Sequence, residues 1–344
     1  MATLAQPNFD SLIATTLQNY NRKATSQILS RSVVWFKLKE KGRITNWDGG
    51  RTIVEPLISA ETTAIKMIRG YEEYDTTPQE GITAAEFEAK QMVGVVSISG
   101  IEEALNSGSR EKVVDLLETK MEQLDTTFQN KLGIFALADG SADGGRHFNG
   151  LDVMIENGGT WGTYGTIDRN AADGSGNFWR NLYTAAGDSF DDVGQAQWRT
   201  FHNTLTIGND EPDLYLVSQG IHEEYEKELT ANTRYEFIQA KFDKRMGDAG
   251  FSALLFKNVP VVYEVNMDSY ITDGAGTAEG AKVILGLNTK YIAFRALKGR
   301  NMVLTPFVKP INQDARLAAR LFYGNFTCSD SHRQGRLLFT AVTD

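Results

Sequence analysis

The stretch 109-SREKVVDLLETKMEQLDTTFQNKLGIFALADG-140 carries the longest unbroken pattern in the chain. Its apolar residues recur at steps of three or four, which places them within an arc of about 100° on a helix. At 1.5 Å per residue, the pattern predicts a helical rod of about 43 Å. We expect its apolar stripe to pack on a sheet built from residues before it and from the last third of the chain. The stripe consists of Val113, Leu117, Met121, Leu124, Phe128, Leu132 and Phe135.

Two strand-like runs precede the rod. The first is Arg51–Leu57, and the second is Phe87–Ser99, in which Phe87, Ala89, Val93 and Val95 stand on alternate positions. The residues between them include the polar, acidic segment 71–82 with its turn-forming Pro and Gly. The pattern predicts a long two-stranded excursion with a solvated tip. A hairpin of this kind has little core of its own, so it needs a partner surface.

The remaining chain alternates helices and strands, which predicts an α+β fold. Ser99 and Glu102 have capping-box spacing. Helices are expected at Asn8–Ser30, at Phe190–Leu205 with Asp191 or Asp192 as N-cap, and at Gln219–Leu229 with Ser218 as N-cap. Strands are expected at 213–217, 259–263, 283–287, 291–296, 302–308, 317–328 and 335–342.

Length and charge limit the possible functions. With 344 residues the chain exceeds the size at which a single core stops growing, so two domains are expected. The net charge of −9 argues against a protein that binds nucleic acid through phosphate contacts. Residues 1–45, however, carry seven basic residues against two acidic ones. This basic arm could reach a neighbouring subunit or a packaged polyanion, or it could be an ordinary solvated helix.

No arrangement typical of an enzyme stands out. The four histidines have no metal-ligand spacing, and no phosphate-binding or nucleophile motif occurs. We therefore predict no catalytic, cofactor-binding or metal-binding residues. The single cysteine, Cys328, lies in a strand pattern and is expected to be buried. No apolar run of 18 residues occurs, so no membrane-spanning helix is expected.

The order of these parts resembles the major capsid proteins of tailed bacteriophages with the Hong Kong 97-type fold. In that family the long spine helix ends in an acidic-Gly turn and is soon followed by a Gly-Leu pair, which here are 139-DG-140 and 150-GL-151. Three later segments resemble an axial strand-to-helix unit, an axial strand and the closing strands. They are 212-PDLYLVSQGIHEEYEKEL-229, 258-NVPVVYEVNM-267 and 302-MVLTPFVKPINQDARLAARLFYGNFTCSDSHRQGRLLF-339.

The resemblance implies a division into domains. It implies an N-terminal arm at 1–48 and an extended β-hairpin loop at 49–98. A peripheral domain would comprise 99–147 and 300–344, with its spine helix at 109–138, and a central axial domain would span 148–299. The implied function is structural and not enzymatic. Subunits would assemble into hexamers and pentamers of an icosahedral head around double-stranded DNA, first as a procapsid that later matures.

The resemblance also implies partners. The chain would contact itself, a separate scaffolding protein and a portal protein, and would touch packaged DNA only non-specifically. It would assemble in the cytoplasm of the bacterial host and end up in the virion. The candidate residues for contacts between subunits are Arg22, Lys23, Lys37, Lys39, Lys41, Lys66, Arg69, Glu72, Glu73 and Asp75.

Two alternatives stay open at this point. An encapsulin-like nanocompartment shell would share the fold. An uncharacterised two-domain enzyme or ligand-binding protein would have its site in the Gly/Trp/Tyr-containing loop at 158–180.

Overall fold

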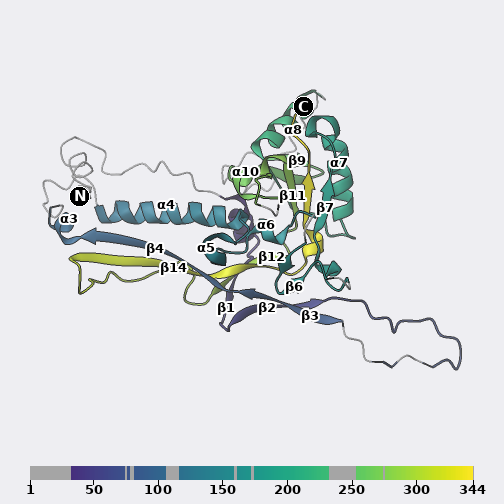
Figure 1. The fold of residues 1–344 in the computed structure, drawn as a ribbon, viewed down its shortest axis with the longest axis horizontal. Coiled ribbons are helices and arrows are strands. Elements are labelled where there is room, and N and C mark those ends of the chain that lie inside the picture. The colour runs from purple at the N-terminus through teal and green to yellow at the C-terminus, as the bar shows by residue number, and fades with distance from the viewer. Residues whose placement is uncertain are drawn as a thin grey trace. The chain divides into compact units, whose positions relative to one another are not determined.

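The chain forms two compact units in a computed structural model (Figure 1). The smaller contains Gln91–Leu132 and Gly299–Tyr323, and the larger contains Ser32–Lys90, Gly133–Lys298 and Gly324–Asp344. The structure describes residues 32–73, 76–77, 81–105, 116–158, 161–171, 174–231, 253–273 and 276–343. The helix expected at Asn8–Ser30 lies outside these residues.

The smaller unit is built around helix α4 (Leu116–Leu137), whose first part lies in it. Strand β14 (Ala315–Cys328) pairs with β4 (Lys90–Ser99) and with β13 (Val303–Leu304), and α4 packs on this sheet. The Phe128 and Phe322 rings meet edge to face at 6.3 Å. A Cβ on Gly94 would lie 2.7 Å from the Leu124 side chain. The absence of a side chain at Gly94 therefore allows α4 to pack close to β4. The spine helix is confirmed at Leu116–Leu137, as are its sheet partners, and the first part of the predicted helix, 109–115, lies outside the described residues.

Short helix α3 (Gly100–Leu105) begins with the expected capping box. The Glu102 N–H donates to Ser99 Oγ at 3.2 Å, and the Ser99 N–H donates to the Glu102 carboxylate at 3.2 Å. Two backbone donors that the helix itself cannot satisfy are thus paired reciprocally.

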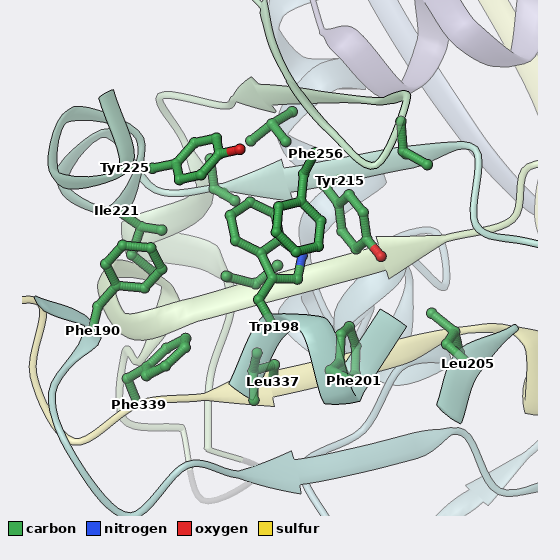
Figure 2. Close-up of a cluster of buried hydrophobic side chains, with 14 residues drawn as sticks. Phe190, Trp198, Phe201, Leu205, Tyr215, Ile221, Tyr225, Phe256, Leu337 and Phe339 are labelled. Carbon is green, nitrogen blue, oxygen red and sulfur yellow. The ribbon is translucent and has the colours of Figure 1, made fainter. Parts of the chain in front are cut away.

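The larger unit contains a six-stranded mixed sheet covered on one face by α7 (Phe190–Leu205) and α8 (Gln219–Ala231) (Figure 1). Between sheet and helices lies an aromatic core in which Trp198 stacks on Phe256 with ring centroids 4.3 Å apart (Figure 2). The strands are, in spatial order, β7 (Leu182–Ala185), β15 (Gly335–Leu338), β11 (Val283–Leu287), β8 (Leu214–Val217), β10 (Val259–Tyr263) and β9 (Ala253–Phe256).

Other elements complete the larger unit. Strand β12 (Ile292–Leu297) pairs in parallel with β1 (Ile44–Trp47) and antiparallel with the end of β14. Helix α2 (Val33–Glu40) packs there through Trp35, 5.0 Å from the Phe294 ring. The short elements are β5 (Thr163–Tyr164), β6 (Ile167–Asp168), α5 (Ala142–Gly145), α6 (Leu151–Met154), α10 (Met267–Tyr270) and the 3-10 turns Asn177–Trp179, Gly280–Lys282 and Ser331–Arg333.

Helix and strand predictions in this unit are confirmed at Phe190–Leu205, Val259–Tyr263 and Val283–Leu287. Ser218 caps α8 as predicted, because its Oγ accepts the Ile221 N–H at 3.2 Å. The predicted N-cap of α7 is wrong. Ser189, whose backbone is extended, is the N-cap residue instead. Asp191 and Asp192 therefore lie in the first helical turn, where their negative charge interacts favourably with the helix dipole.

The predicted return strand of the hairpin is also wrong. Strand β2 (Thr52–Ile58) pairs with β3 (Ile82–Glu88), whereas β4 pairs with β14. The physical reason is that the alternation of buried residues shifts by one position between β3 and β4. Ala85 and Phe87 are buried at odd positions, whereas Val96 and Ile98 are buried at even ones. A side-chain period of two makes such a change diagnostic of two separate strands.

Candidate interaction surfaces

The β2–β3 hairpin is half anchored and half exposed. Near its base, Ile53, Leu57, Ala85 and Phe87 are buried in the larger unit. Beyond Ile58 and Ile82, which are 83% and 84% exposed, the described residues of the segment 59–81 are almost all exposed. The far half of the hairpin therefore has the character of a surface that another molecule covers.

Large apolar side chains stand out on that far half. Met67 and Tyr71 are completely exposed, at 100% and 107%. The predicted contact residues Lys66, Arg69, Glu72 and Glu73 lie on the same segment and are all exposed. The structure thus brings these four charged residues and the apolar ones onto a single loop. Asp75 lies outside the described residues, as do Arg22 and Lys23.

A second apolar surface, the outer face, lies on the smaller unit's sheet, opposite α4. Gly94, Val96 and Phe322 point toward α4, so the alternate residues point away from it. Val93 and Val95 of β4 are 49% and 59% exposed there. The register places further apolar residues on the same face, with Val303 opposite Leu321 and Val308 opposite Leu317. The outer face is formed by Val93, Val95, Val303, Val308, Leu317 and Leu321.

The sequence interpretation missed this outer face because it placed Val93 and Val95 in one strand with Phe87, on the same alternate positions. The change of phase between Phe87 and Val96 was the available indication. It places Val93 and Val95 on the side opposite to the buried Val96.

The basic residues of α2 are placed differently from one another. Lys37 is buried and lies 3.3 Å from the Glu40 carboxylate. Lys41, just past the helix, forms an ion pair with Asp213 at 2.8 Å, whereas Lys39 is exposed. Of these three, Lys39 is the side chain most available to a neighbour.

The start of α2 is held by a buried carboxyl group. The Val33 N–H donates to Glu264 Oε2 at 3.1 Å. Burial raises the pKa of Glu264 to about 7, although hydrogen bonds from Val33 and Asn266 oppose the shift. The carboxyl group therefore titrates near neutral pH at the N-terminal end of α2.

The other buried charges are matched within the larger unit. Arg336 is completely buried and donates to Asp152 at 3.2 Å and to the Thr272 carbonyl oxygen at 2.7 Å. Burial raises the pKa of Asp152 to about 6. Arg169 pairs with Glu156 at 2.6 Å. The Arg336 contacts tie α6 and the Thr272 loop to the sheet, and the Arg169 pair joins two loops. The sequence did not predict these pairs, because the partner of a buried charge is known only from the fold.

Groups suited to catalysis are few in the described part of the chain. No set of three or more His, Cys, Asp or Glu residues there could hold a metal ion. Cys328 is buried as predicted, and burial raises the pKa of its thiol to about 12. In the loop considered for a ligand site, Tyr164 and Trp179 are buried and stack on each other with centroids 6.0 Å apart.

No helix in the described ranges has the length and apolar character needed to span a bilayer.

Comparison with solved structures identifies the fold. The capsid of cyanophage A-1(L) matches with a TM-score of 0.62 and 14% identity, over 95% of this chain and 98% of that one. The capsid of Myoviridae phage XM1 matches with a TM-score of 0.55 and 12% identity, over 94% and 97%. The capsid of a native GTA particle matches with a TM-score of 0.53 and 14% identity, over 94% and 95%.

No protein-family model matches the sequence. No curated protein matches it either. The likeness to the solved structures is therefore one of fold, and it extends over nearly the whole chain. The α+β, Hong Kong 97-type capsid fold predicted from the order of the parts is confirmed.

Proposed function

We propose that the chain is the major capsid protein of a tailed bacteriophage, a structural subunit that self-assembles into hexamers and pentamers of an icosahedral head around double-stranded DNA. The observation that carries the proposal is the end-to-end likeness to phage capsid chains, which covers 95% of this chain and 98% of the cyanophage chain. A match of that extent accounts for the hairpin and the long helix together with the two units.

The exposed apolar surfaces support self-assembly. The far half of the hairpin and the outer face are different surfaces of one chain. When a surface on one copy contacts a different surface on the next copy, the contact is heterologous and closes into rings if the rotation allows. Rings of five and six need this kind of contact.

Within this proposal, residues 49–98 contact a neighbouring subunit through Lys66, Arg69, Glu72 and Glu73. The arm proposed at 1–48 would end before α2, because α2 and β1 pack in the larger unit. The peripheral domain proposed at 99–147 and 300–344 and the axial domain proposed at 148–299 need a changed C-terminal boundary, because β15 (Gly335–Leu338) pairs between β7 and β11 in the larger unit's sheet. The subunit has no enzymatic role in this scheme.

Further partners belong to the same role. A scaffolding protein would guide assembly in the bacterial cytoplasm, and a portal protein would occupy one vertex. The net charge of −9 fits a wall that touches packaged DNA without holding it tightly.

The test is assembly of the purified chain, with and without a scaffolding protein, followed by sedimentation and negative-stain microscopy. Closed particles with pentamers and hexamers are expected. A monodisperse monomer under every assembly condition would contradict the proposal. Particles that form without scaffold and enclose a protein cargo but no DNA would indicate a nanocompartment shell instead.

A deletion separates folding from assembly. Removing Glu61–Thr77 and joining the ends with a short Gly-Ser linker leaves the β2–β3 ladder intact. The variant is expected to fold with the stability of the full chain and to form no closed shells. Normal shells from this variant would rule out a contact role for the far half of the hairpin.

A further inference from the structure

The base of the β2–β3 hairpin is anchored on both strands, and this arrangement determines its direction. On β2, the buried Glu55 accepts hydrogen bonds from Arg295 Nε at 2.8 Å and from Thr327 Oγ1 at 3.1 Å. Both partners belong to the strands β12 and β14 of the larger unit. An ion pair shielded in this way, with a further hydrogen bond on the same oxygen, holds its strand in a specific place.

The anchor on β3 is the turn between β5 and β6. The Glu86 N–H donates to the Gly165 carbonyl oxygen at 3.0 Å. The Phe87 ring meets the Tyr164 ring with centroids 5.1 Å apart. The turn itself is held from behind, because Trp179 Nε1–H donates to the Tyr164 carbonyl oxygen at 3.0 Å.

Gly165 is where the turn and the strand come closest. Its φ of +60° is a left-handed conformation that favours glycine. A Cβ at this position would lie 2.9 Å from the Ala85 Cβ and 3.0 Å from Phe87 Cζ. Any side chain at Gly165 would therefore push β3 away from the turn.

A tilt at the base is carried outward. The β2–β3 pairing runs without interruption from Thr52 opposite Glu88 to Ile58 opposite Ile82. Past Ile58 and Ile82 the described residues are almost all exposed, so nothing there restores the original direction. The far half of the hairpin points wherever the anchored half directs it.

We propose that Gly165 is a positioning residue for assembly: by admitting Ala85 and Phe87 at contact distance, it sets the angle at which the hairpin leaves the larger unit and meets a neighbouring copy. The claim that Gly165 sets the angle of the hairpin concerns a single subunit. The claim that this angle matters for contact with a neighbouring copy rests on the proposed function.

The test compares three variants of the full chain. Gly165→Ala introduces the clash. Gly208→Ala is the matched control, because its φ of +65° carries the same backbone strain while a Cβ there would meet nothing within 4 Å. The double variant Gly165→Ala/Ala85→Gly relieves the contact with Ala85 and leaves the one with Phe87, so it is a partial rescue.

The direct readout is a spin-label distance between cysteines placed at the exposed residues Glu61 and Arg199 in the unassembled subunit. Cys328 is buried with a raised pKa and remains unlabelled. We expect the parent and Gly208→Ala to share one distance distribution, and Gly165→Ala to give a displaced or broader one. Backbone amides of 52–55, 57–58 and 82–88 should exchange hydrogen about tenfold faster in Gly165→Ala, and the partial rescue should move both readouts back toward the parent.

Identical distributions in Gly165→Ala and Gly208→Ala would overturn the proposal. If Gly165→Ala fails to fold, Phe87→Leu replaces it, since it keeps the glycine and loosens the same contact. An unchanged distribution in Phe87→Leu would then reject the proposal.

The assembly part is read as the yield of closed shells, which should fall at least tenfold in Gly165→Ala and recover in part in the partial rescue. A displaced hairpin with an undiminished yield would reject the role in assembly. If the parent chain forms no shells at all, the proposed function fails while the distance result still decides whether Gly165 directs the hairpin.

Discussion

The aromatic core beneath α7 and the far half of the β2–β3 hairpin contain the same kinds of residue in opposite situations. In the core, Trp198 is completely buried, stacked on Phe256 at 4.3 Å and edge-on to Tyr215 at 5.1 Å. On the hairpin, Met67 and Tyr71 are completely exposed. The comparison shows that large apolar side chains in one chain can serve two purposes: they stabilise the subunit where they are enclosed, and they are available for association where they are left open.

The largest expected effect on stability is in the core. Trp198→Ala should lower the free energy of unfolding by about 3–5 kcal/mol, because a large buried ring is lost and the cavity cannot collapse fully. Denaturant unfolding followed by circular dichroism measures this. The matched variant Tyr71→Ala should change it by less than about 0.5 kcal/mol and yet reduce shell formation. Equal losses of stability in Trp198→Ala and Tyr71→Ala would show that Tyr71 also stabilises the subunit.

The next effect depends on pH and lies at the start of α2. The pKa of Glu264 is raised from 4.5 to about 7, so the folded state binds this proton more tightly than the unfolded state. Its contribution to stability is complete below pH 4.5 and is lost as the pH rises through 7. Glu264→Gln keeps an acceptor oxygen for the Val33 N–H and removes the titration.

At pH 8 the Glu264→Gln variant should therefore be more stable than the parent, by about 3 kcal/mol at most. The difference should shrink toward pH 5, as measured by denaturant unfolding across that range. Glu73→Gln on the exposed loop is the control and should follow the parent. Parallel profiles for Glu264→Gln and the parent would show that the carboxyl group does not titrate in this range.

A smaller effect compares the two sides of a single strand. Val96→Ser should cost about 1–3 kcal/mol of stability, because Val96 of β4 is buried. Val93→Ser and Val95→Ser on the outer face should each change stability by less than about 0.5 kcal/mol, while the pair together lowers shell yield. A loss of stability at Val93 comparable to that at Val96 would show that the outer face is already covered within the subunit.

The smallest effect concerns charge on the exposed loop. Lys66→Glu with Arg69→Glu should leave unfolding unchanged, since both side chains are exposed. Assembly followed by light scattering should be weakened more at low than at high ionic strength, because salt screens contacts between exposed charges. A deficit that is independent of salt would mean that these residues act through shape and not through charge.

Local patterns in the sequence predicted the elements well. The capping box at Ser99 and Glu102, the Ser218 cap and the helix Phe190–Leu205 depend on residues close together in the chain. The spine helix was predicted from its apolar period, and the order of the parts was sufficient to suggest the fold. The two domains expected from chain length correspond to a two-unit division in which α4 and β14 each belong to both units.

What could not be predicted depends on residues far apart. Arg336 and Asp152, or Glu55 and Arg295, become partners only through the fold. The pairing of β2 was misassigned because both β3 and β4 have apolar residues at alternate positions, and strand propensity alone does not choose between two such candidates. The role of Gly165 needs the position of Phe87, which no local pattern supplies.

The topology of the larger unit has a consequence for how the protein is made. Strand β15, near the C-terminal end of the chain, lies inside the six-stranded sheet between β7 and β11. Near the other end, Ile44 of β1 pairs with Phe294 of β12. Contacts this distant in sequence form slowly, because the loops between them must close first. The sheet of the larger unit therefore cannot be completed until β15 has been synthesised, and until then the earlier strands expose apolar edges that favour aggregation.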